Sequence, residues 1–224
     1  MADPSNSIES ALSAFFNAAG TLATDDQSLT NVQGFSNSAK ALAARITGFN
    51  EVIDRLKGSV SQDMQGALEK ANTLAPALAK INERILSSYS TGNVTASADL
   101  LDERDRLANE LQGLLGGVTQ FNDNGTASFQ VGGIFIVDGI KANKFTQTDV
   151  SASPYVVRVT SAEGADLGAM STKFSDTNTE TNWTSGQVAA DYKLLTEFIP
   201  KMKSQLSALT ISLYRDVNSV QKAS

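Results

Sequence analysis

A long periodic pattern of apolar side chains occupies residues 35–85. Apart from two consecutive steps of four at Leu56, Val60 and Met64, which resemble a stutter, the pattern alternates steps of four and three residues, as is typical of a helix that packs against another helix. Its positions are Phe35, Ala39, Leu42, Ile46, Phe49, Ile53, Leu56, Val60, Met64, Ala67, Ala71, Leu74, Leu78, Ile81 and Ile85. We call this row of side chains the seam. It predicts a mostly helical region over 26–88, which would be roughly 90 Å long at about 1.5 Å per residue. Pro76 lies inside this region and predicts a kink.

Shorter helical patterns lie on either side of the seam. Residues 7–19 predict a helix with Ser7 as N-cap and Gly20 as its end. A second short helix carries leucines at heptad spacing and ends at Gly116–Gly117. The last helix repeats the same spacing and contains Pro200, which interrupts its hydrogen bonding but not its seam. The apolar positions of these last two helices are Leu100, Leu107, Leu111 and Leu114, then Val188, Tyr192, Leu195, Ile199, Met202, Leu206, Leu209 and Leu213.

The region between these two helices has the pattern of strands. Residues 118–121 and 126–131 flank Asn122–Gly125, whose Asn-Gly pair suits a tight hairpin turn. Residues 134–137 and 155–160 also predict strands, and 176–184 predicts a polar loop containing the single tryptophan, Trp183.

Matching helical seams before and after a strand-rich region indicate an α+β fold, in which an elongated antiparallel helical bundle carries an inserted small β subdomain. We expect residues 1–117 to form the N-terminal part of the bundle. Residues 118–184 would form the β subdomain, and 185–224 the returning helix that completes the bundle.

Composition removes most catalytic classes. The chain contains no cysteine and no histidine, so cysteine nucleophiles, Ser-His-Asp triads, disulfides and thiolate or imidazole metal sites cannot form. Its net charge is -6, which disfavours nucleic acid and anionic membranes as partners. No Sec signal peptide and no membrane-length apolar stretch is visible. The pattern favours a cytoplasmic protein or one exported without a Sec signal.

The remaining candidates for chemistry have simpler explanations. Residues 102–106 form the densest charge cluster, and we expect Asp102 and Arg106 to form an i,i+4 pair on a solvated helix face rather than an acid-base pair. The stretch 122–125 fails the calcium-loop pattern and fits a hairpin turn. Gly132–Gly133 and Gly139 lack the phosphate-loop context, and Trp183 is expected to pack over a small core. We therefore expect no catalytic, cofactor-binding or metal-binding residue, no cofactor and no enzymatic activity.

The seams themselves have two interpretations, and both can hold together. They form the core of this bundle, and the surplus on so long a helix could receive further segments or neighbouring subunits. The sequence does not apportion residues between these two roles.

Several stretches resemble one family. Residues 98–111, ADLLDERDRLANEL, resemble the "dLlDqRDrLldeLs" signature of the flagellar hook-associated protein 1 family. A hairpin with Gly125-Thr126 and the run Val131-Gly132-Gly133 follow, as they do in that family. Residues 9–23, ESALSAFFNAAGTLA, are similar to its "aLdaFFnalqdLa" helix, and 199–218 to its "lPkyraqLdeLAatLadeVN" helix. The order of these motifs also agrees, so the resemblance covers most of the chain.

The resemblance implies a structural subunit at the junction of the bacterial flagellar hook and filament. Such a subunit is exported by the flagellar type III apparatus and is extracellular. Its partners would be the hook protein and the second junction protein, with an export chaperone in the cytoplasm. Its helical inner domains would join neighbouring subunits, and its largely β outer domains would face outward. Members of the family carry terminal heptad segments that are not visible here, so we expect a core fragment that is a soluble monomer.

Three alternatives remain open. The second junction protein and flagellin are related axial proteins. A secreted coiled-coil adhesin or phage-tail module would tend to form a parallel homo-oligomer. A carboxylate-only glycosidase would need two convergent acids in an aromatic-lined cleft.

Overall fold

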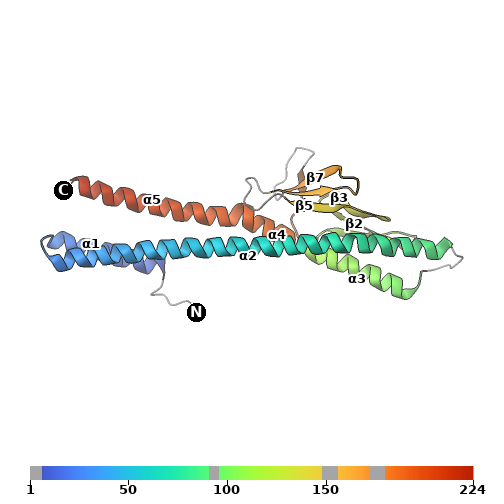
Figure 1. Ribbon diagram of the computed structural model, residues 1–224, viewed down its shortest axis with the longest axis horizontal. Helices are drawn as coiled ribbons and strands as arrows, with labels where there is room; N and C mark the ends of the chain where they lie inside the picture. The colour runs from blue at the N-terminus through green and yellow to red at the C-terminus, as the bar shows by residue number, and fades with distance from the viewer. Residues whose placement is uncertain (1–6, 91–95, 148–155, 172–179, 224) are drawn as a thin grey trace. The chain divides into compact units, whose positions relative to one another are not determined.

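A computed structural model describes residues 7–90, 96–147, 156–171 and 180–223 (Figure 1). The predicted α+β fold class is confirmed. The helical segments are α1 (Ile8–Thr24), α2 (Leu29–Ser90), α3 (Ala98–Leu115), α4 (Gln187–Lys193), the π-helical turn η2 (Leu194–Phe198) and α5 (Ile199–Ala223). The strands all lie between α3 and α4 in the sequence. None of the described helices is both long and apolar enough to cross a bilayer.

The two N-terminal helices largely match their predicted bounds. Ser7 caps α1 as expected, because its hydroxyl accepts a hydrogen bond from the Ser10 amide at 3.0 Å. Gly20 does not end the helix, which continues to Thr24. A glycine inside a helix costs only about 1 kcal/mol, so neighbouring residues can carry the helix past it. The second helix, α2, contains 62 residues and is continuous through Pro76.

The C-terminal helical region contains a feature that the periodicity did not predict. Residues 194–198 form a π-helical turn that ends two residues before Pro200. Proline lacks an amide proton, so it cannot bond the carbonyl one turn earlier. Leu195, Ile199 and Leu206 of the apolar row are buried, so the row is not exposed at this turn.

The chain divides into two compact units. Unit 1 consists of residues 1–58 and 199–224, and unit 2 of residues 59–198. Unit 1 therefore contains α1, the N-terminal half of α2 and α5. Unit 2 contains the C-terminal half of α2, α3, every strand and α4. The division into residues 1–117, 118–184 and 185–224 follows changes in secondary structure rather than compactness, and it stays a prediction.

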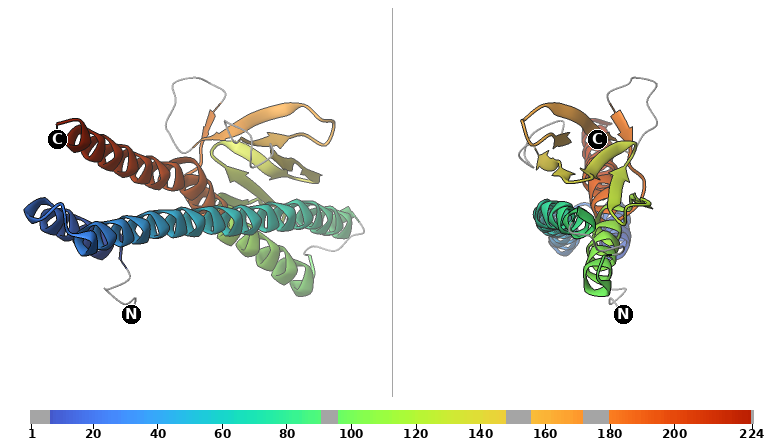
Figure 2. Two further views of the ribbon diagram at one scale, coloured as in Figure 1. Left: turned by 60° about the vertical axis from the view of Figure 1, so that its left-hand side comes forward. Right: turned by 90° about the vertical axis from the view of Figure 1, so that its right-hand side faces the viewer.

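Unit 2 contains two four-stranded sheets (Figure 2). The first sheet is an antiparallel meander in the order β1-β2-β3-β4, and the second has the order β5-β6-β7-β8 with β7 and β8 parallel. The strands of the first sheet are Val118–Phe121, Ala127–Val131, Ile134–Asp138 and Lys141–Ala142; those of the second are Lys144–Gln147, Val157–Thr160, Asp166–Ser171 and Glu180–Asn182.

Four of the strands agree with the sequence pattern. These are β1, β2, β3 and β6, although residue 155 of the predicted strand 155–160 lies outside the described residues. The pattern missed β4, β5, β7 and β8. The polar loop predicted over 176–184 is wrong for β8, while 176–179 lies outside the described residues. These strands are short, polar or rich in small residues, so their strand conformation comes from pairing with neighbours rather than from their own alternation.

Two asparagines of α2 connect this helix to the sheets. The amide of Asn72 bonds both backbone groups of Phe145 in β5, at 2.9 and 2.7 Å. The fully buried Asn82 bonds both backbone groups of Ala127 in β2, at 2.7 and 2.9 Å, and also the carbonyl of Gly139. A side-chain amide offers a donor and an acceptor side by side, so each asparagine takes the place of a neighbouring strand.

A close backbone contact joins the end of α3 to the segment before α4. Gly116 has φ +66°, and a Cβ at this position would lie 2.1 Å from the carbonyl carbon of Ser185. The indole of Trp183 donates to the carbonyl of Leu115, and its ring lies 5.4 Å from that of Phe145. As expected from the sequence, Trp183 packs in a small core, with 2% of its surface exposed.

Candidate interaction surface

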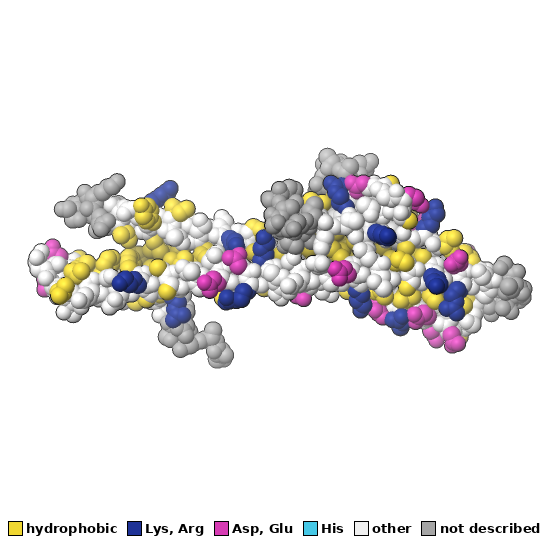
Figure 3. All heavy atoms as spheres, in the orientation of Figure 1, with side chains coloured by type: hydrophobic (Ala, Val, Ile, Leu, Met, Phe, Trp, Pro, Cys, Tyr) yellow, Lys and Arg dark blue, Asp and Glu magenta, His cyan; other side chains and the backbone are white. Residues whose placement is uncertain are grey.

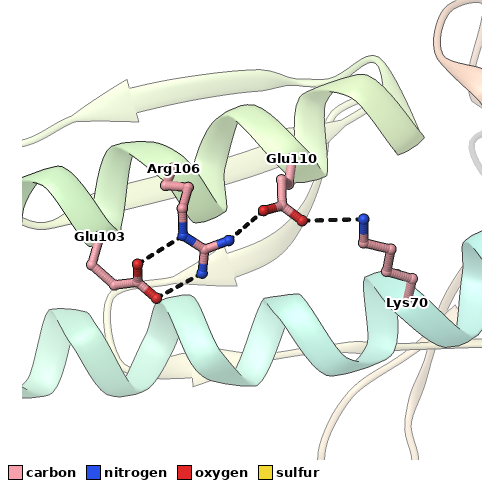
Figure 4. A network of polar contacts seen from close by, with 4 residues as sticks. All are labelled: Lys70, Glu103, Arg106 and Glu110. Atoms are coloured by element: carbon pink, nitrogen blue, oxygen red, sulfur yellow. Dashed lines mark hydrogen bonds and ion pairs between the residues drawn. The ribbon is translucent and has the colours of Figure 1, made fainter.

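The charged cluster on α3 forms a network on the surface of unit 2 (Figure 4). The Arg106 guanidinium bonds Glu103 at 2.7 Å and also bonds Glu110. Glu110 in turn lies 3.2 Å from the Lys70 ammonium group of α2. The expected Asp102–Arg106 pair is wrong, because Arg106 turns toward the acids three residues before it and four residues after it. The expectation of ion pairs on a solvated helix face is confirmed.

The electrostatics of this network do not suit proton transfer. The hydrogen bond from Arg106 lowers the pKa of Glu103, and the hydrogen bond from Lys70 lowers the pKa of Glu110. Both carboxylates therefore stay ionised at neutral pH, whereas a general acid needs a raised pKa. The network instead links α3 to α2 across the surface of unit 2.

The glycine-rich turns have structural roles. The hairpin predicted at Asn122–Gly125 joins β1 to β2, with Gly125 at φ +78°. Gly132 and Gly133 form the turn between β2 and β3, also at positive φ. Within the described residues, no three His, Cys, Asp or Glu side chains gather as metal ligands.

The seam of α2 is closed within unit 2. All of its positions from residue 60 to 85 are buried: Val60, Met64, Ala67, Ala71, Leu74, Leu78, Ile81 and Ile85. A second buried row lies beside it and includes Leu68, Ala75 and Ala79. The sheets lie along one side of this half of α2 and α3 along another (Figure 1), so two different elements cover the helix here.

The same seam is open within unit 1. Only Leu42 and Ile53 are buried among its seven positions there. Phe49 and Leu56 are each 41% exposed, and Val52 between them is 49% exposed. Figure 3 shows hydrophobic side chains running along this half of α2. We call Phe49, Val52 and Leu56 the open stripe.

The packing of α1 explains where the seam opens. The Phe15 ring of α1 lies 5.2 Å from that of Phe35, so α1 covers the beginning of α2. The start of α1 lies at a groove of about 560 Å³ lined by Ser7, Ile8, Ala44, Arg45, Gly48, Phe49 and Val52. Because α1 begins there, it does not extend over Leu56.

The last helix covers another side of α2 in unit 1. Lys203 of α5 forms an ion pair with Asp54 of α2. A second groove, of about 300 Å³, lies between the two helices and includes Ile46, Leu206 and Ile211. Asp54 thus lies near Lys203 and Ile46 near Ile211, so the two helices run antiparallel. Ile211 and Tyr214 of α5 are 47% and 70% exposed, so apolar surface is left uncovered on both helices.

The contacts of Asn72 and Asn82 could have been expected from the sequence, because both asparagines lie on an apolar face of the helix, but they were not predicted. Asn82 lies four residues after Leu78 and three before Ile85, so it is a polar residue on an apolar face. Asn72 has the same relation to Leu68 and Ala75. A polar side chain at such a position needs a buried partner, but the pattern does not say which backbone provides it.

Comparisons with known proteins agree with this architecture. The family model described as "Flagellar hook-associated protein FlgK helical domain" matches residues 1–224. Flagellar hook-associated protein 1 of Salmonella typhimurium (strain LT2) is 26% identical over 155 residues, which cover 69% of this chain and 28% of that protein. The Escherichia coli (strain K12) protein of the same name is 22% identical over 160 residues, covering 71% of this chain and 29% of that protein. The chain thus spans less than a third of the length of these relatives.

A solved structure has a similar fold. It is described as the flagellar hook junction protein FlgK from Burkholderia pseudomallei, and it aligns with a TM-score of 0.73 and 21% sequence identity. The alignment covers 94% of this chain and 37% of that chain.

Proposed function

Because the chain belongs to the family of the flagellar hook-associated protein FlgK helical domain, we propose that it is part of a structural subunit at the junction of the flagellar hook and filament. The observation that carries this proposal is the open stripe on α2. A helix face that is apolar, exposed and continuous with a buried seam is suited to receive a neighbouring helix.

The proposed partners are other axial proteins of the flagellum. The resemblance to hook-associated protein 1 supports the hook protein and the second junction protein as neighbours, and an export chaperone in the cytoplasm. It also supports an extracellular location reached without a Sec signal. The β-rich segment 118–184 would be an inserted subdomain on the outer side of the assembly. No catalytic role is proposed, since the carboxylates of the charged network are held ionised by their basic partners.

The test is to place a charge on the open stripe of the full-length protein in its own bacterium. We expect Val52→Glu and Leu56→Glu to reduce filament attachment and swimming in soft agar, because a buried unpaired carboxylate disfavours docking. The matched control is Asn37→Glu, which adds the same charge at an exposed polar position of α2. Normal motility in both stripe variants, with normal protein levels, would refute the role of the stripe.

The solution state separates this proposal from a coiled-coil adhesin. At concentrations of about 10 μM we expect a monomer by light scattering, because the seam in unit 2 is closed within one chain. A stable parallel trimer or dimer would favour the adhesin interpretation. Rings or fibres formed by this chain alone would contradict the expected monomer.

A further inference from the structure

The edges of the two sheets are protected to different degrees. An exposed strand edge is a template for pairing with another chain, so proteins shorten, charge or cover their edges. The β4 edge has two residues and carries Lys141. At the β5 edge, Asn72 bonds both backbone groups of Phe145. The β8 edge has three residues and carries Glu180.

Within the part of the chain that the structure describes, the remaining edge, β1, has none of these protections. Its sequence is Val-Thr-Gln-Phe, without charge or proline. Val118 and Phe121 are 60% and 55% exposed, and Gln120 is exposed as well. Among the described ring contacts of Phe121 is the Arg104 guanidinium, whose central carbon lies over the ring at 4.6 Å from its centroid.

In an antiparallel ladder, hydrogen-bonded and non-hydrogen-bonded residue pairs alternate. This alternation shows which backbone groups of β1 point away from β2. The Asn122 amide bonds the Thr126 carbonyl, so residues 122 and 126 form a hydrogen-bonded pair. The next pair, Phe121 and Ala127, is then a non-hydrogen-bonded pair. Ala127 agrees with this assignment, because both its backbone groups point away from β1 and bond Asn82.

It follows that Thr119 and Phe121 present their amide and carbonyl groups at the free edge. Val118 and Gln120 have their amides in the ladder with β2. In the described part of the chain, the Thr119 hydroxyl is buried and also has no hydrogen-bond partner. The edge therefore offers two donor–acceptor pairs, one at each of these two residues.

We propose that two copies of this chain pair through β1, forming a continuous eight-stranded antiparallel sheet. With the two-fold axis at Gln120, Thr119 of each copy lies opposite Phe121 of the other. Each of the two such pairs exchanges two N–H···O bonds, which satisfies the four outward groups of each strand. A second copy suits this edge because β1 carries no charge, so that pairing brings no like charges opposite each other. This arrangement is isologous, as a two-fold dimer requires.

The pairing is expected to be weak. A contact through four-residue strands is smaller than a standard protein–protein interface. We expect a dissociation constant on the order of 0.1 to 1 mM. The chain then remains a monomer at about 10 μM and dimerises as its concentration approaches that range.

Single cysteines test the register, because the chain has no cysteine of its own. The two Gln120 residues would form a non-hydrogen-bonded pair with Cα atoms about 4.5 Å apart, which is within disulfide range. We expect Gln120→Cys at about 0.2 mM to form a covalent dimer under mild oxidation at least tenfold faster than Thr146→Cys. Thr146 is a matched control, being exposed on β5, whose edge Asn72 occupies. Equal rates for the two variants would overturn the proposal.

A proline variant tests the backbone ladder itself. Thr119→Pro removes an outward amide but no hydrogen bond to β2, so the sheet should persist. In the Gln120→Cys background it should slow cross-linking at least tenfold, with unchanged circular dichroism and Trp183 fluorescence. Unchanged cross-linking in the folded variant would show that the strands do not pair. Leu56→Glu should leave the cross-linking rate unchanged, which separates this contact from the open stripe on α2.

Amide exchange provides a measurement without substitutions. At low concentration the amides of Thr119 and Phe121 should exchange rapidly and those of Val118 and Gln120 slowly. At high concentration the first two should slow by at least threefold. Protection of Thr119 and Phe121 at every concentration would mean that the chain itself covers this edge, and the proposal would be wrong.

Discussion

The two halves of α2 carry the same seam but use it differently. From Val60 onward every seam position is buried, because sheets and a helix cover that half of the helix. Before residue 59 the described residues that cover the seam belong to helices, and its positions Phe49 and Leu56 stay exposed, as does the adjacent Val52. Apolar spacing thus predicts a surface that packs, while the neighbouring elements decide whether it packs within one chain. The closed half is buried within unit 2, whereas the open half keeps apolar side chains exposed to solvent.

The largest expected difference between the halves comes from leucine truncation. Leu78→Ala should lower the free energy of unfolding by about 2 to 5 kcal/mol, because it leaves a cavity in a closed core. Leu56→Ala should cost less than about 1 kcal/mol, because that side chain is already partly in water. Urea unfolding followed by Trp183 fluorescence reports on unit 2 for the first variant, and circular dichroism follows the second. Equal losses would contradict the open stripe.

The next largest loss of unfolding free energy should come from replacing Asn82, a buried polar residue of unit 2. The seam residues of unit 1 are all apolar. Asn82→Ala removes the partner of two buried backbone groups of Ala127 and of the part-buried Gly139 carbonyl, and should cost about 3 kcal/mol or more. Asn72→Ala should cost less, about 1 to 2 kcal/mol, because Asn72 is half-buried and water can reach its partners. The urea midpoints of the two variants measure this difference, and a larger loss at Asn72 would refute the assigned roles.

Replacing a glycine by alanine should change the free energy of unfolding in opposite directions in the two units. Gly116→Ala in unit 2 should destabilise by about 2 to 3 kcal/mol, since φ is +66° and the new methyl group would meet backbone. Gly48→Ala in unit 1 should stabilise by about 0.5 to 1 kcal/mol, since it lies within α2 with nothing within 4 Å. Thermal unfolding of both variants checks the two signs. Gly133→Ala is a control with positive φ but open space.

The smallest effect concerns the charge of Asp191 in unit 2. Desolvation, and secondarily the nearby Asp63, raise the pKa of Asp191, while a hydrogen bond with Gln187 opposes the shift. A raised folded-state pKa means that unit 2 is more stable with Asp191 protonated. This contribution is lost as the pH rises from the unfolded-state pKa, near 3.8, through the folded-state pKa.

Asp191→Asn should therefore stabilise unit 2 at neutral pH, by well under about 1 kcal/mol because the group is partly solvated. At about pH 3 the gain should vanish, since the wild-type carboxyl is then protonated in both states. Urea midpoints measured by Trp183 fluorescence at both pH values test this. A gain of the same size at both pH values would show that the charge is not its cause.

Helices were the most predictable part of the fold. Their heptad spacing is a property of consecutive residues, so α2 and α3 could be predicted from the sequence with bounds close to those observed. The hairpin of β1 and β2 could also be predicted from neighbouring residues alone, because Asn124-Gly125 specifies its turn. The strands β4, β5, β7 and β8 carry little alternation of their own, and pairing with neighbouring strands provides what their sequences lack.

For the candidate surface, too, some features could be predicted from the sequence and others only from the tertiary structure. The sequence by itself determined that this chain has a long heptad-bearing helix, that its chemistry excludes cysteine and histidine sites, and that its motifs resemble one structural family. Only the tertiary structure decided that the seam closes after residue 59 and stays open at Phe49 and Leu56, with the exposed Val52 beside them. It alone also showed that Asn72 bonds the β5 edge, while β1 is an end strand of its sheet among the described residues. Periodicity is encoded locally, but burial depends on which distant elements reach a face, and that is settled by packing.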